Sequence, residues 1–78
     1  MTYISHENSF LEVHLSRIVS AHEKYFVELK KNNKQLVSFH MKADSLDRWI
    51  VTKPVPIWVS RLVPELTSAI QNHRRFFN

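Results

Sequence analysis

The segment spanning residues 24–42 contains the residue types that bind anionic partners. It carries five of the chain's eleven lysines and arginines, together with Phe26 and His40. Lysines neutralise phosphates, and the rings of phenylalanine and histidine stack on nucleic-acid bases. Glu28 lies among these lysines and would repel a phosphate. The segment predicts either a contact face or a solvated strand face, because exposed strands also use lysine to prevent edge pairing. The candidate nucleic-acid-binding residues are Lys24, Lys30, Lys34 and Lys42, with Phe26 and His40 as stacking rings.

A second candidate contact lies at the C-terminal end, where His73, Arg74, Arg75, Phe76 and Phe77 follow one another. Arginine and aromatic side chains dominate the energetics of protein interfaces, so this run could anchor a partner. The alternative is that the arginines compensate a helix dipole while Phe77 packs on a sheet and Phe76 is incidentally exposed. Sequence alone leaves both interpretations open.

Catalytic and metal-binding patterns are absent from the sequence. The five histidines include no pair spaced by three or four residues, as two metal ligands on one helix face would be. His22 and Glu23 begin a zincin-like string, but Phe26 occupies the place of its second histidine. The chain has no glycine for a phosphate-cradling loop and no cysteine nucleophile. We therefore predict a protein that is not an enzyme and has no catalytic residue, cofactor or metal.

Length and charge restrict the class of protein. Seventy-eight residues predict one compact domain, residues 1–78. The net charge of +4 favours an acidic partner, either a nucleic acid or an acidic protein surface. Without cysteine, a signal-peptide pattern or an apolar run long enough to span a membrane, the chain is expected to be cytoplasmic and to have no membrane partner.

Residues 24–42 also predict a β-hairpin, and the faces of its strands determine its register. A two-residue loop at Asn32 and Asn33 would pair Phe26 with Phe39 and mix apolar and polar side chains on both faces. A three-residue loop instead pairs Lys30 with Lys34 and separates the faces. Since a slip of one residue moves every side chain to the other face, we predict strands at residues 24–30 and 34–42 with the three-residue loop. Asn33 takes the left-handed conformation because the chain has no glycine.

The first twenty residues fit two secondary structures. A capping pattern at Ser9 and a shared face for Leu11, Leu15 and Ile18 suit a helix. Alternation of Leu11, Val13 and Leu15 with polar residues suits a strand. A lone hairpin is marginal in water and gains from a third strand. We therefore predict a strand at residues 10–19 and a turn at His22 and Glu23.

Two helices are expected after the hairpin. Asp44 can cap a helix at residues 44–51, with Asp47 at its third position and Leu46, Trp49 and Ile50 facing inward. Prolines 54 and 56 end it, and Pro64 opens a helix at residues 64–77. Trp49 and Trp58 flank the proline-rich turn, where they either form a ligand groove or fill the core. The predicted architecture is α+β: a three-stranded antiparallel β-meander packed by a short helix and a C-terminal helix.

The stretch NNKQLVSFHMKADSLDRWIVTKPVPIW, followed by a helix ending in NHRRFFN, resembles one group of anti-CRISPR proteins. These are small phage-encoded inhibitors of bacterial type I surveillance complexes. The similarity lies in size, in a β-meander that runs into an Asp-Ser…Trp helix, and in a proline break before the last helix. The chain departs by lacking glycine in its turns and by its positive charge, which argues against the acidic DNA mimicry of many such inhibitors. The resemblance implies a non-enzymatic protein that occupies a site on a larger host assembly.

Two functions follow as predictions. The first is an inhibitor or modulator, of phage or mobile-element origin, that docks on an acidic surface of a larger host protein or nucleoprotein complex. The second is a small basic regulator that binds nucleic acid through its lysines. For the first function, the predicted partner-binding residues are Phe26, His40, Arg74, Arg75 and Phe76.

Overall fold

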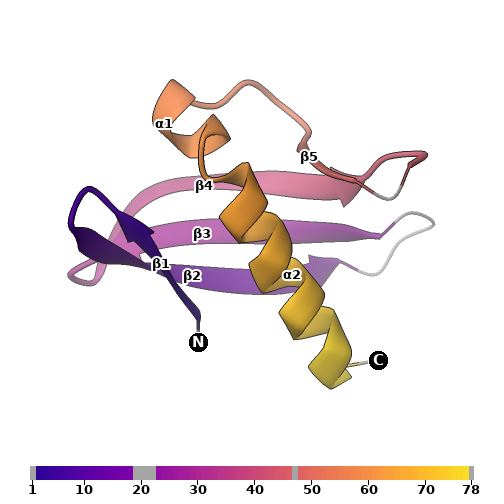
Figure 1. Cartoon of the computed structure of the whole chain (residues 1–78), viewed down its shortest axis with the longest axis horizontal. Coiled ribbons are helices and arrows are strands. Elements are labelled where there is room, and N and C mark those ends of the chain that lie inside the picture. The colour runs from indigo at the N-terminus through magenta and orange to yellow at the C-terminus, as the bar shows by residue number, and fades with distance from the viewer. Residues whose placement is uncertain (1, 19–22, 47, 78) are drawn as a thin grey trace.

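A computed structural model describes residues 2–18, 23–46 and 48–77, and for Phe76 and Phe77 it describes the backbone alone. Five strands precede two helices (Figure 1). The predicted α+β class is confirmed, but the predicted number of three strands is wrong: one antiparallel sheet holds all five in chain order. The elements are β1 (Thr2–His6), β2 (Ser9–Ile18), β3 (Lys24–Lys31), β4 (Lys34–Ala43), β5 (Trp49–Val51), α1 (Ile57–Ser60) and α2 (Val63–Phe77).

The strand predicted at residues 10–19 is confirmed as β2, and the helical alternative is wrong. The sequence analysis did not predict β1, which is joined to β2 by a turn at Glu7 and Asn8 and pairs with it. Both turn residues have positive φ, 48° and 62°. Asparagine tolerates this left-handed conformation, whereas glutamate does not favour it. Glu7 therefore hid the turn from sequence analysis. The expected turn at His22 and Glu23 lies partly outside the described residues.

The predicted three-residue loop between β3 and β4 is wrong. Lys31 pairs with Lys34, and both Asn32 and Asn33 have positive φ, which makes a two-residue turn. The register then shifts between Leu29 and Lys30, because Leu36 is an extra residue on β4. This bulge returns Val37 and Phe39 to the face on which we expected them. The predicted faces are therefore correct although the loop is not.

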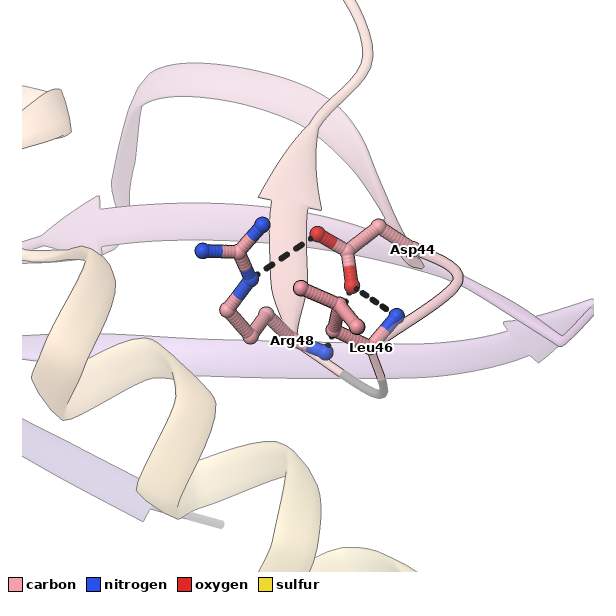
Figure 2. A network of polar contacts seen from close by, with 3 residues as sticks. All are labelled: Asp44, Leu46 and Arg48. Carbon is pink, nitrogen blue, oxygen red and sulfur yellow. Dashed lines mark hydrogen bonds and ion pairs between the residues drawn. The ribbon is translucent and has the colours of Figure 1, made fainter.

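The helix predicted at residues 44–51 is also wrong. Asp44 does bind backbone N–H groups, but it closes a turn: Leu46 and Arg48 each donate their N–H to its Oδ1 at 2.9 Å (Figure 2). Arg48 Nε lies 3.0 Å from Oδ2 of the same carboxylate. Short polar side chains stabilise such turns in competition with helix starts. The chain then reverses into β5, where Trp49 pairs with Ala43.

Alternation along β5 explains the inward and outward residues that the helix prediction placed incorrectly. Trp49 is buried, as expected, whereas Ile50 is exposed. Leu46, also expected inside, is exposed in the turn. Asp47 lies outside the described residues. The strand period of two, and not the helical period of 3.6, sets the directions of Trp49 and Ile50.

The predicted C-terminal helix is confirmed as α2, with Pro64 in its first turn and Glu65 placed to favour the helix dipole. In Figure 1, α2 (yellow) crosses one side of the sheet. Leu66 and Ile70 of this helix are fully buried with Tyr25, Val27 and Leu29 of β3, and Val59 and Leu62 complete the core from α1 and the residues after it. The core thus lies between the helices and one face of the sheet.

Candidate functional site

The opposite face of the sheet, which we call the open face, carries the side chains that alternate with the core residues. Register places Phe26 directly across from His40, and Lys24 directly across from Lys42. Because Tyr25, Val27 and Met41 point into the core, these four neighbours point away from it. On the central three strands this face includes Phe10, Glu12, His14, Ser16 and Ile18 of β2, Lys24, Phe26, Glu28 and Lys30 of β3, and Ser38, His40 and Lys42 of β4.

Four of these residues form the strongest candidate site, the β3–β4 patch: Lys24, Phe26, His40 and Lys42. The rings of Phe26 and His40 lie with centroids 5.1 Å apart at 49°. Phe26 is half-buried and His40 is exposed, so the ring pair presents a supported aromatic surface to solvent. The two lysines lie two residues further along their strands, about 7 Å from the rings. A pair of cations thus adjoins a pair of rings.

Two hollows adjoin the β3–β4 patch, one at its lysine end and one beside its rings. One, of about 530 Å³, is lined by Lys24, Lys42 and Ile50 together with the start of the β4–β5 turn. Asp44 also lines this hollow. Its carboxylate accepts hydrogen bonds from the backbone N–H groups of Leu46 and Arg48 and from the Arg48 side chain, and these contacts lower the pKa of Asp44. The backbone hydrogen bond from Arg48 contributes most to that shift.

The second hollow, of about 300 Å³, lies on the β5 side of the rings. Phe26 and His40 form one wall, and Thr52, Lys53 and Pro54 form the other. The Thr52 N–H donates to the His40 carbonyl at 3.1 Å, which fixes this wall against β4. Lys53 is exposed and adds a cation to the site. Sequence analysis missed Lys53 because its proximity to His40 depends on the unpredicted strand β5.

The remaining predicted lysines lie elsewhere. Lys30 is directly opposite Glu12, and Lys34 is opposite Lys31 at the exposed tip of the hairpin. Both are about 20 Å from Lys24 along the strand direction. Of the four lysines predicted to bind nucleic acid, the structure therefore brings only Lys24 and Lys42 together.

Acidic side chains lie beyond the β3–β4 patch toward the hairpin turn, whereas its direct neighbours on β2 are Ser16 and Ile18. Glu28 lies opposite His14 and is the next residue beyond Phe26 on this face. The Glu12 carboxylate contacts His14 Nε2 at 3.3 Å. Glu28 and Glu12 therefore repel an anion from the half of the open face near the hairpin turn, and Lys24 and Lys42 attract it to the other end.

The predicted arginine anchor lies on the other side of the sheet, because α2 packs on the core face. Arg74 Nε is 2.8 Å from Glu23 Oε2, and both atoms are buried. The Arg74 guanidinium also lies over the Trp49 ring, 5.8 Å from its centroid. Arg75 is exposed, and the side chain of Phe76 lies outside the described part of the chain. The structure therefore does not join Arg74 and Arg75 to Phe26 and His40.

A cluster around Tyr25 fixes the C-terminal half of α2. The Tyr25 hydroxyl hydrogen-bonds His73 Nδ1 at 3.2 Å, and the Tyr25 ring meets the Trp49 ring edge-on at 5.6 Å. Burial raises the pKa of the Tyr25 phenol, and the Glu23 carboxylate adds to the rise. Trp49 is therefore a core residue, and Trp58, half-buried, packs against the same core. These contacts favour the core-filling interpretation of both tryptophans.

No group of three or more histidine, aspartate or glutamate side chains among the described residues is placed to hold a metal ion. Nor do they contain a helix with the length and apolar character needed to cross a membrane.

The chain matches no protein-family model, no curated protein and no solved structure at a significant level. The resemblance to anti-CRISPR inhibitors therefore stays a prediction. Function has to be inferred from the open face itself.

Proposed function

We propose that this chain is a non-enzymatic binding protein that docks through the open face of its sheet on an acidic surface of a larger protein or nucleoprotein assembly, and so inhibits or modulates it. The observation that carries the proposal is the convergence of Lys24, Phe26, His40 and Lys42 on two adjacent strands. The hairpin brings together residues that are 14 to 18 positions apart in the sequence. Arg74 has no part in this contact, because it binds Glu23 and Trp49 within the chain.

The physical basis is a combination of charge and apolar contact. Cations increase the rate of encounter with an acidic surface and set its orientation. Rings supply the contact area that holds the complex, and aromatic side chains are frequent hot spots. Phe26 is suited to this role because its half-buried ring is already held by the sheet, so binding costs little side-chain entropy.

A pair of charge-matched variants tests the proposal. Lys24→Gln with Lys42→Gln removes two charges from the β3–β4 patch. Lys31→Gln with Arg61→Gln removes two charges from exposed positions away from it. The wild-type chain and both variants are used to capture partners from lysate of the source organism, at two salt concentrations, with and without nuclease.

The proposal expects a defined complex that the wild type and the Lys31/Arg61 control retain and the Lys24/Lys42 variant loses. Equal retention by both variants would show that the patch is not the docking site. Detectable turnover of a substrate that one substitution abolishes without unfolding the chain would contradict the non-enzymatic assignment.

A further inference from the structure

We infer that the acidic partner of the β3–β4 patch is single-stranded nucleic acid, bound with its bases against Phe26 and His40 and its phosphates against Lys24, Lys42 and Lys53. This inference rests on the proposed function and specifies the chemistry of the partner. The observation behind it is the order in which lysines and aromatic rings follow one another on the open face, in addition to the net charge.

The order of groups alternates between cations and rings. Lys24 and Lys42 lie at one end, the Phe26–His40 pair follows about 7 Å further along the strands, and Lys53 lies beyond His40 across the second hollow. A single strand has the complementary order, with charged phosphates separated by flat bases. An acidic protein surface can also contact both rings and lysines, but a single strand repeats charged and flat groups along one chain, which matches this order more closely.

The rings are accessible in the way that base stacking requires. His40 is exposed, and Phe26 is half-buried beside it, with the two rings tilted by 49°, so each ring offers part of its surface to solvent. Single-strand-binding proteins combine such surfaces with a basic groove. In a duplex the base faces are already stacked on one another, and only the phosphates could meet this site.

The acidic side chains define the path of the strand. Glu28 follows Phe26 on β3 toward the hairpin turn, and Glu12 lies further toward that turn on β2, opposite Lys30. Phosphates are therefore disfavoured toward the hairpin turn, and the favourable path runs from Lys24 and Lys42 past the rings toward Lys53. Asp44 also lines the first hollow, so a phosphate there is held on its lysine side. The two hollows, about 530 and 300 Å³, lie on this path.

Salt dependence measures the phosphate contacts. Three lysine–phosphate contacts on a single strand give a slope of log affinity against log salt of about −2, and removal of two leaves about −0.7. Loss of one stacking ring lowers affinity about fivefold or more without changing the slope. The two kinds of contact are therefore separable in one titration series.

The test is fluorescence anisotropy with labelled 12-nucleotide dT and rU strands, a 12-base-pair duplex and a 12-residue polyglutamate peptide, at several salt concentrations. The variants are His40→Ala, Phe26→Leu, the Lys24→Gln/Lys42→Gln pair and the Lys31→Gln/Arg61→Gln control. His40→Ala alters an exposed side chain, so it keeps the test valid if Phe26→Leu lowers stability.

The inference expects both single strands to bind more tightly than the duplex and the peptide. His40→Ala should weaken single-strand binding about fivefold or more at constant slope and leave duplex binding unchanged. Equal binding of duplex and single strand, unaffected by His40→Ala, would overturn the inference. So would tighter binding of polyglutamate, but this result would leave the proposed docking on an acidic protein intact. If no probe binds and lysate capture also ignores the Lys24/Lys42 pair, both proposals fail.

Discussion

Replacing Lys42 by glutamate should stabilise the fold while it abolishes binding. Lys42 lies directly opposite Lys24, and like charges in this arrangement destabilise a sheet. If the two ammonium groups are about 7 Å apart in water, their repulsion is roughly 0.6 kcal/mol. Lys42→Glu removes this repulsion and introduces a similar attraction, so the free energy of unfolding should rise by about 1 kcal/mol. Lys42→Gln removes only the repulsion and should give about half the gain.

The stability measurement is urea unfolding followed by tryptophan fluorescence, with Trp49 as a buried reporter. A gain of about 1 kcal/mol corresponds to a rise in melting temperature of roughly 4–8 °C in a domain of this size. The gain should mostly disappear at 1 M salt, where the screening length is only about 3 Å. Arg61→Glu makes the same change in net charge at an exposed position outside the sheet and is the matched control.

Two results would refute this reasoning. A gain that survives 1 M salt would show that charge repulsion between Lys24 and Lys42 is not its source. Retained binding by the stabilised Lys42→Glu variant would show that the patch does not contact the partner. A rise in stability with a loss of binding is the pattern of a surface kept for function at some cost in stability.

Three further predictions concern the fold. Tyr25→Phe should lower the free energy of unfolding by about 1 kcal/mol, because it removes the hydrogen bond to His73. Because burial raises the pKa of Tyr25, wild-type stability should also fall as pH rises above about 10, and unfolding measured through that range should show a smaller loss of stability for the variant. Glu7→Asn should raise the free energy of unfolding by about 0.5–1 kcal/mol, because asparagine tolerates the left-handed turn better. An unchanged midpoint of urea unfolding would contradict this. Asp44→Ala should lower the melting temperature at neutral pH by opening the turn to Arg48, and the difference should shrink in thermal melts as pH falls below about 3.8, because a lowered pKa in the fold means that the stabilisation is lost on protonation.

Alternation of apolar and polar residues was sufficient to predict which side chains of the central strands face the core. Val27, Leu29 and Phe39 point inward as expected, because a strand buried on one face has period two. The same signal was available for β5, where Trp49 is buried and Ile50 exposed, but three residues are too few to show it. An aspartate before this segment suits a helix cap and a turn equally, and only the pairing with β4 decides between them.

The arginine anchor shows a different limit of sequence analysis. Arg74 and Glu23 are 51 residues apart, and nothing local indicates that they meet. The cations at the end of α2 looked like free surface groups or dipole compensation. Tertiary packing of α2 on the sheet instead brings Arg74 onto Trp49 and Glu23, so that of Arg74 and Arg75 only Arg75 is exposed.

The β3–β4 patch itself depends on a detail that face segregation cannot reveal. The predicted loop pairs Lys24 with His40 and Phe26 with Ser38, whereas the bulge at Leu36 pairs Lys24 with Lys42 and Phe26 with His40. These registers differ by two residues, and since two is the period of a strand, both place the same side chains on the same faces. Hydrophobic pattern therefore supports both equally. Only the bulged register sets ring against ring and lysine against lysine, so one extra residue in β4 converts scattered basic and aromatic residues into a single site.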